Sequence, residues 1–125
     1  MVTTKKPVEH AVVDLGAAVA RHRYCVLHAH DRQANMKKKG MDLPNTCRIL
    51  EICNPPQTRA ILEQDMSLNL ILPCRVLVYE DKGGTRIGML RPAALLAGLS
   101  VDVKVAAAAR EVEETMIRII EEARQ

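Results

Sequence analysis

The sequence predicts an α+β domain in which one sheet of four or five strands carries long helices on one face. Two apolar runs rich in β-branched residues, 48–53 and 72–80, predict strands, and the amphipathic segment between them predicts a helix. The glycine-containing segment 81–84 predicts a tight hairpin turn. We expect residues 1–125 to form a single domain, because neither a linker nor a repeat divides the chain.

The composition is that of a globular protein with an aliphatic core. With 125 residues, the chain is long enough to bury roughly two-thirds of its unfolded surface. The apolar fraction of 48% and the charged fraction of 26% are ordinary for soluble domains. Since Trp and Phe are absent and only Tyr24 and Tyr79 are aromatic, we expect Val, Ile, Leu, Met and Ala to fill the core.

Charge and hydropathy argue against two classes of partner. The net charge of +3 is small and dispersed, and two tyrosines offer few stacking platforms, so we expect no specific nucleic-acid partner. No apolar run has the length of a membrane span, and the N-terminus lacks the apolar region of a signal peptide. We therefore expect a cytoplasmic protein without a membrane partner, whose four cysteines are free thiols.

The N-terminal part is predicted to contain a strand, a helix and a second strand. Residues 2–6 predict a short edge strand, and apolar residues at helical spacing predict a helix over 8–22, opened by Pro7. Gly16 costs this helix about 1 kcal/mol relative to Ala, so we expect a close packing contact there. Residues 24–30 predict the next strand.

A short helix and another strand follow. Asp31 is a suitable N-cap for a helix over 32–39, and Gly40 occupies the position of a left-handed C-cap. Residues 41–45 predict a loop, and 46–53 predict the second main strand.

The middle of the chain is predicted to hold a helix between two strands. Asn54 is a good N-cap, and Pro55 fits the first position of a helix over 55–65. The segment 66–72 is apolar without a clear period, so we expect a packed loop. Residues 73–80 predict a strand.

The C-terminal part completes a hairpin and ends in a long helix. The turn 81–84 is expected to lead into a strand over 85–90 and a short helix over 92–96. Ser100 is expected to cap the final helix, 101–124. The predicted core consists of Val12, Leu15, Val19, Ile49, Ile61, Val76, Val78, Ile87, Val112, Met116 and Ile119.

Three short motifs carry a resemblance to a known family. They are Glu-Ile-Cys-Asn-Pro at 51–55, Leu-Glu-Gln-Asp-Met at 62–66 and Leu-Pro-Cys-Arg-Val at 72–76. With these motifs the sequence resembles the domain-of-unknown-function 302 family over nearly the whole chain. The resemblance implies a mostly antiparallel sheet with helices packed on one face, a TBP-like arrangement and a homodimer, but no reaction. One departure is at 22–24, where the family usually places a glycine before the strand.

Cys53 is the candidate with the most specific placement. It ends a strand immediately before a predicted helix N-terminus at Asn54, where free N–H groups and the helix dipole favour an anion. A thiol at this place can have a lowered pKa and act as a nucleophile. A small carboxylate, phosphate or sulfate would fit the same place, although Pro55 and Pro56 remove two donors. The alternative is that Cys53 is simply a small buried apolar residue.

Cys74 is the only thiol partner that we expect for Cys53. Antiparallel strands would bring the two cysteines together, whereas a right-handed parallel crossover would place them at opposite edges of the sheet. The sequence leaves both arrangements open.

Arg48 and Arg75 each interrupt an apolar strand. If the two strands are adjacent, we expect both guanidinium groups on one face, where their donors would suit an anionic ligand. The alternative is that they form surface or interface salt bridges with Glu51, Glu80 or the C-terminal helix.

His28 and His30 lie on the same face of a predicted strand, an arrangement that metal sites use. They could ligate a metal or haem if Asp31, Cys53 or another residue supplied a third ligand. Solvent-facing or hydrogen-bonded histidines are the alternative.

Taken together, these patterns favour a binding protein over an enzyme. The sequence contains no paired-carboxylate set, no Ser-His-Asp candidate and no glycine-rich phosphate loop. Its patterns do not identify a cofactor. We expect a module that binds a small molecule or anion, with ligand contacts from Cys53, Asn54, Arg48, Cys74 and Arg75. The rival hypotheses are a sulfur-carrier or redox-sensing protein that uses Cys53, and a structural dimer joined through the segment 66–72.

Overall fold

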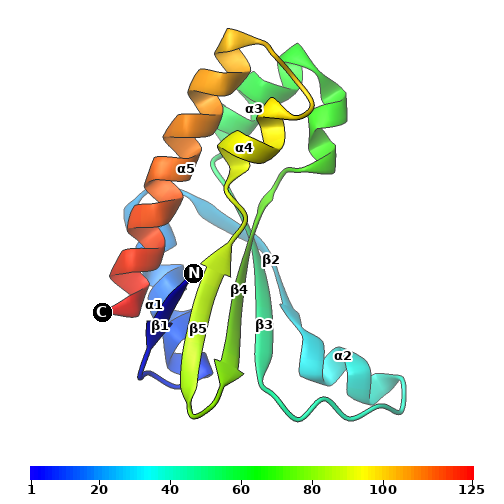
Figure 1. Cartoon of the computed structure of the whole chain (residues 1–125), viewed down its shortest axis with the longest axis vertical. Coiled ribbons are helices and arrows are strands. Elements are labelled where there is room, and N and C mark those ends of the chain that lie inside the picture. Colours follow the sequence, from blue (N-terminus) through cyan, green and yellow to red (C-terminus); the bar gives the residue numbers. More distant parts are fainter.

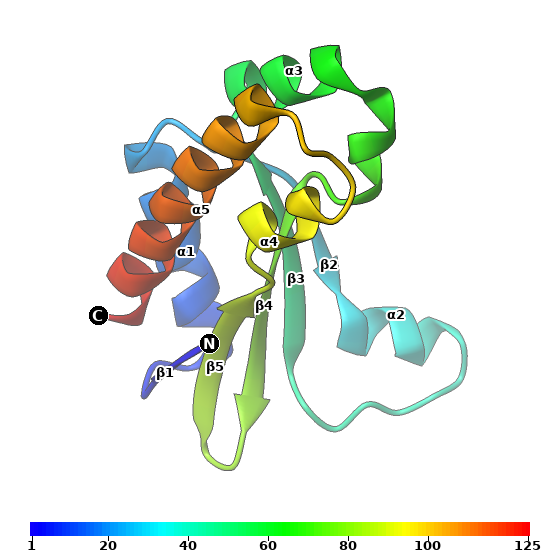
Figure 2. The same cartoon turned by 45° about the horizontal axis from the view of Figure 1, so that its top comes forward.

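The computed structural model describes residues 1–125 and contains one antiparallel sheet of five strands in the order β1-β5-β4-β3-β2. Helices α1 and α5 pack on one face of this sheet, while α3, η1 and α4 gather at one end (Figures 1 and 2). The predicted α+β class is confirmed. The elements are β1 (Val2–Thr4), α1 (Val8–Arg21), β2 (Cys25–Asp31), α2 (Arg32–Lys38), β3 (Cys47–Cys53), α3 (Pro55–Gln64), the 3₁₀ helix η1 (Met66–Leu70), β4 (Cys74–Asp81), β5 (Gly84–Met89), α4 (Pro92–Ala97) and α5 (Val103–Arg124).

The ends of the sheet differ in how they are covered. Helix α2 projects from the end opposite to α3 and α4, away from the other helices (Figure 1).

None of the helices combines the length and the hydropathy that crossing a membrane requires.

The hairpin between β4 and β5 has the turn that its glycines predict. Lys82 and Gly83 both have positive φ angles, of 48° and 82°, as the two central residues of a type I′ turn require. Asp81 lies opposite Gly84, and this register continues along both strands. The turn therefore fixes which residues of β5 share a face with those of β4.

One face of the sheet is buried under α1 and α5. The core-facing residues of the three central strands are Leu50, Ile52, Val76, Val78 and Ile87, and none is more than 2% exposed. Successive strand residues point to opposite faces, so their neighbours along each strand lie on the open face.

The predicted core is correct except at two positions. Ile49 and Val12 are only half-buried. Ile49 points to the open face, and Leu50 and Ile52 fill the core in its place. Both sets of alternating residues in β3 contain apolar side chains, and each set also contains one charged residue, Arg48 or Glu51. The composition of the strand therefore does not show which set points inward.

Two predicted helix caps are confirmed. Asn54 Oδ1 accepts a hydrogen bond from the Gln57 N–H at 3.1 Å, and Asp31 Oδ1 accepts one from the Ala34 N–H at 2.9 Å. Each bond satisfies a donor that the first helical turn leaves free. These caps explain why α3 and α2 begin where the sequence places them.

Three local predictions are wrong. Asp102, not Ser100, caps α5, because its carboxylate accepts from two N–H groups of the first turn. Part of the segment 66–72, expected to be a loop, forms the 3₁₀ helix η1, in which Leu68 is buried in the core. A Cβ atom at Gly16 would meet nothing within 4 Å, so this glycine does not mark a close packing contact.

The turn after α1 explains the departure from the family pattern. Arg23 has a φ of 61°, in the left-handed region that glycine adopts without strain. Its N–H donates to the Ala20 carbonyl, and the Tyr24 N–H donates to the Val19 carbonyl, both at 3.0 Å. This is the Schellman arrangement of a helix C-terminus, here with arginine at the left-handed position.

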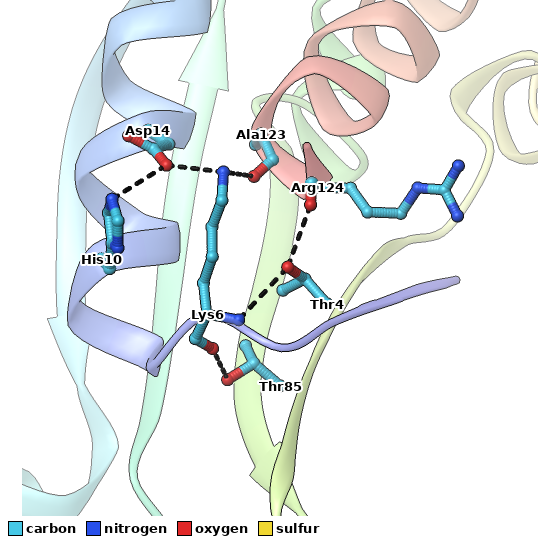
Figure 3. A network of polar contacts seen from close by, with 7 residues as sticks. All are labelled: Thr4, Lys6, His10, Asp14, Thr85, Ala123 and Arg124. Atoms are coloured by element: carbon cyan, nitrogen blue, oxygen red, sulfur yellow. Dashed lines mark hydrogen bonds and ion pairs between the residues drawn. The ribbon is translucent and has the colours of Figure 1, made fainter.

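Lys6 joins the N-terminal segment to the middle of α1 and to the C-terminal end of α5 (Figure 3). Its Nζ donates to Asp14 Oδ2 in α1 at 2.7 Å and to the Ala123 carbonyl in α5 at 2.9 Å. Thr4 Oγ1 donates to the Arg124 carbonyl at 2.9 Å. A cation and a hydroxyl thus satisfy two carbonyls that the last turn of α5 leaves without partners.

The same segment is fixed to the sheet. Thr85 in β5 is buried, and its Oγ1 donates to the Lys6 carbonyl at 2.7 Å (Figure 3). His10 adds a second basic group, with its Nε2 atom 3.4 Å from Asp14 Oδ2. The network therefore connects β5, α1 and α5 around one lysine.

We predict that Lys6→Met lowers stability at neutral pH and flattens its dependence on acid. The hydrogen bond from Lys6 holds the pKa of Asp14 below its ordinary value of 3.8. The resulting stabilisation is complete above about pH 4 and is lost as the pH falls through the lowered pKa. The free energy of unfolding should be measured in urea from neutral pH to about pH 2.5, with exposed Lys5→Met as the control. Identical acid profiles for wild type and Lys6→Met would contradict this role.

Candidate functional site

The two arginines predicted to share a site lie on opposite faces of the sheet. Arg48 lies opposite Val78 and faces the helices, where it pairs with Glu9 of α1 and, at 3.1 Å, with Asp31. Arg75 lies opposite Glu51 and faces the open side. The expectation of one shared face is wrong. Arg48 and Glu51 are three positions apart in β3, and since side chains alternate along a strand they point to opposite faces.

A cluster of cysteines lies at the end of the sheet beneath α3. Cys25, the first residue of β2, pairs with Cys53, the last residue of β3, and their Sγ atoms are 3.7 Å apart. Ile52 pairs with Cys74, so the antiparallel alternative is correct and Cys74 lies at the same end. The expectation that Cys74 is the only thiol near Cys53 is wrong, since Cys25 is its direct partner.

The Cys53 and Cys74 thiols are neutral at physiological pH. Burial raises the pKa of Cys53 to about 11, and the hydrogen bond and charge of Cys25 act in the same direction. Burial likewise raises the pKa of Cys74 to about 11. Burial therefore acts against the thiolate expected at the α3 N-terminus, because desolvation disfavours the charged form of the thiol. Cys53, which is 7% exposed, matches the alternative of a small buried residue.

Tyr24 is a further polar residue near the cysteine cluster, and the sequence patterns did not mark it as a candidate site residue. It is 7% exposed, and its hydroxyl has no hydrogen-bond partner. Burial raises the pKa of Tyr24, while the nearby side chains of Thr115 and Asn54 oppose the rise. Its hydroxyl is thus a buried donor without an acceptor near the cysteine cluster.

The histidines of β2 lie on the open face beside Glu51. The rings of His28 and His30 meet edge to face with centroids 4.5 Å apart, and His30 Nε2 is 3.3 Å from Glu51 Oε1. The suggested third ligand Asp31 is already paired with Arg48. No group of three or more His, Cys, Asp or Glu side chains is arranged to hold a metal ion. Metal or haem ligation through these histidines stays a prediction.

The open face carries a groove made of two adjacent hollows that share Arg75 and Leu90. We call it the Arg75 groove. The first hollow, of about 290 Å³, is lined in addition by Met1, Ile49, Leu77, Gly88 and Met89. The second, of about 300 Å³, is lined in addition by Leu70, Ile71, Cys74, Pro92 and Leu95.

Arg75 is the only charged side chain that lines this groove. It takes part in none of the ion pairs of the structure. The carboxylate of Glu51, its neighbour across the strands, contacts His30 instead. The groove therefore offers apolar walls and one exposed guanidinium without a partner.

Of the predicted site residues, Arg75 and Cys74 line the groove and the others do not. The sequence patterns did not predict that Ile49, Leu77 and Leu90 would line a binding groove. A signal was present, because β4 is apolar on both faces, at Val76 and Val78 and again at Leu77. A strand that is apolar on both faces indicates that its second face is also covered by something.

The fold and groove define a small α+β domain with one covered and one open sheet face. The family model described as "Domain of unknown function DUF302" matches residues 1–123, and the chain belongs to this family. A solved structure, described as an uncharacterized conserved protein DUF302 from Bacillus stearothermophilus, is similar with a TM-score of 0.89 and 25% identity. The match covers 98% of this chain and 95% of that chain. Among curated proteins, none matches the sequence. The TBP-like arrangement and the homodimer stay predictions.

We predict that Cys53 and Cys74 react slowly with iodoacetamide in the folded protein. A pKa of about 11 leaves roughly one thiol in a thousand ionised at pH 8. The alkylation rate, followed at each cysteine by peptide mass spectrometry, should rise about tenfold per pH unit up to pH 9.5 without levelling off. The urea-unfolded protein is the control. A plateau for Cys53 below about pH 8.5 would contradict the neutral thiol.

Proposed function

We propose that the protein binds a small apolar molecule with one negative charge in the Arg75 groove. The observation that carries this proposal is the unpaired Arg75 guanidinium, the single charged side chain in an otherwise apolar groove. Apolar walls favour a hydrocarbon or aromatic body, and a guanidinium can donate two parallel hydrogen bonds to a carboxylate. The two hollows, of about 290 and 300 Å³, are at the small end of the range for ligand pockets.

The chemistry of the groove favours binding over catalysis. Cys74 is its one potential nucleophile, but this thiol is buried and neutral. No carboxylate or histidine lines either hollow to act as a general acid or base. The groove can therefore hold and orient a ligand, while its lining supplies no acid–base pair.

The α3 N-terminus is a weaker candidate for the anion. Pro55 and Pro56 lack N–H groups, and the Asn54 side chain already occupies the Gln57 N–H. Cys53 fills the space before the helix and stays neutral. These contacts support Arg75, rather than the helix end, as the group that receives the negative charge.

Calorimetric titration with decanoate, an apolar chain with one carboxylate, tests the proposal. We predict that wild type binds decanoate and that Arg75→Gln weakens binding at least tenfold, since a hydrogen bond to a charged group contributes about 1.5–3 kcal/mol. Arg75→Lys should retain part of the affinity. The matched control is Arg86→Gln, because Arg86 points to the same open face but is paired with Asp81. Equal affinities of wild type and Arg75→Gln would contradict the proposal.

A neutral ligand and a substitution in an apolar wall separate the contribution of the charge to binding from the contribution of the walls. Decanol, which has the same chain without the charge, should bind wild type and Arg75→Gln equally weakly. Leu77→Asp should abolish decanoate binding, because it introduces a like charge into the wall of the first hollow. Leu77 is half-buried on the open face, so this variant should keep its fold.

A second copy of the chain is the alternative occupant of the same face. Sedimentation equilibrium of wild type and Leu77→Asp, with and without decanoate, distinguishes the two. A dimer that Leu77→Asp dissociates and that excludes decanoate would make the groove a subunit interface, and the proposed ligand site would be wrong. A monomer that binds decanoate would support it.

A further inference from the structure

Cys25 and Cys53 are placed as the two halves of a disulfide. They are direct partners in the antiparallel register of β2 and β3. The Cα atoms of such partners are about 4.5–5.5 Å apart, within the range that disulfides span. Their Sγ atoms lie at 3.7 Å and must approach to roughly 2.05 Å to form the bond. Small side-chain rotations can supply this change.

The two thiols differ in their access to solvent. Cys25 is half-buried at the start of the edge strand β2, while Cys53 is buried beneath α3. Only β3 pairs with β2, and an irregularity between Val26 and His28 interrupts that pairing next to Cys25. An oxidant therefore reaches Cys25 first, and this end of β2 can adjust to a new bond.

The other cysteines are not placed in this way. Cys47, at the opposite end of β3, lies about 20 Å from Cys53 along the strand. Cys74 is opposite Ile52 rather than opposite a cysteine. Cys25 and Cys53 are thus the one pair of cysteines in direct register.

We infer that Cys25 and Cys53 form a redox-active dithiol that a hydroperoxide oxidises to an intramolecular disulfide. This site is separate from the Arg75 groove, which neither residue lines. The reaction needs a peroxide as the oxidant and a low-molecular-weight thiol to restore the reduced pair.

The chemistry proceeds in two balanced steps. The Cys25 thiolate attacks one peroxide oxygen, so that an S–O bond forms, the O–O bond breaks and the departing hydroxide leaves as water after taking up a proton. The Cys53 sulfur then attacks the Cys25 sulfur, an S–S bond forms and the S–O bond breaks. The second hydroxide leaves as water with the proton of the Cys53 thiol. Two thiols are oxidised while one hydrogen peroxide is reduced to two waters.

The test is treatment of the fully reduced full-length protein with hydrogen peroxide, followed by mass spectrometry. The expected product is a monomeric chain lighter by two hydrogen atoms, in which a non-reducing peptide map links Cys25 to Cys53. Dithiothreitol should reverse the change. The wild-type map decides the question by itself, whether or not a variant folds.

Three variants assign the roles. Cys53→Ser should stop the reaction at a sulfenic acid on Cys25 that dimedone traps, Cys25→Ser should leave Cys53 reduced, and Cys74→Ser should form the same disulfide as wild type. A disulfide that involves Cys74 or joins two chains would overturn the inference. So would a Cys25 thiol that survives peroxide under conditions that oxidise free cysteine.

Discussion

Helices α1 and α5 cover only one face of the sheet, and this one-sided burial decides the environment of most residues in the central strands. Core-facing residues such as Leu50 and Val76 are completely enclosed. Burial of each such side chain contributes roughly 1.5–3 kcal/mol, so the register of the strands is strongly specified. A shift by one residue would exchange the two faces and place Glu51 and Arg75 in the core.

The same constraint separates two regions of different chemistry. At the end covered by α3 and α5, water is excluded, so the Cys53 and Cys74 thiols stay neutral and the Tyr24 hydroxyl has no partner. On the uncovered face, Arg75 keeps its charge exposed beside apolar walls. The buried end holds the Cys25 and Cys53 sulfur atoms 3.7 Å apart, whereas the open face presents the Arg75 guanidinium to solvent.

Local features of the fold could be predicted because their causes lie within a few residues. Asn54 and Asp31 cap helices through bonds to N–H groups three residues away, and the Lys82-Gly83 turn follows from backbone preference. The fold class followed from the alternation of apolar strands with amphipathic helices. The start of α5 was misplaced because Ser100 and Asp102 both suit an N-cap, and only the structure shows which one bonds to the first turn.

The candidate site could be predicted only in part, because its arrangement depends on pairing between distant residues. Arg75 was singled out as a charge in an apolar strand, but its separation from Arg48 requires the register of β3 and β4. The contact of Cys25 with Cys53 likewise requires the register of β2 and β3. The raised pKa of Cys53 depends on burial at a packed end of the sheet, which no local pattern reveals.

Mapping of a ligand onto the backbone tests the central claim, that the open face around Arg75 is the binding site. Decanoate should be titrated into ¹⁵N-labelled protein while amide chemical shifts are recorded. We predict saturable changes concentrated at Arg75, Leu77 and Leu90, with the amide of Gln57 at the α3 N-terminus unchanged. Saturable changes centred on Gln57, or the absence of any saturable change, would contradict the claim.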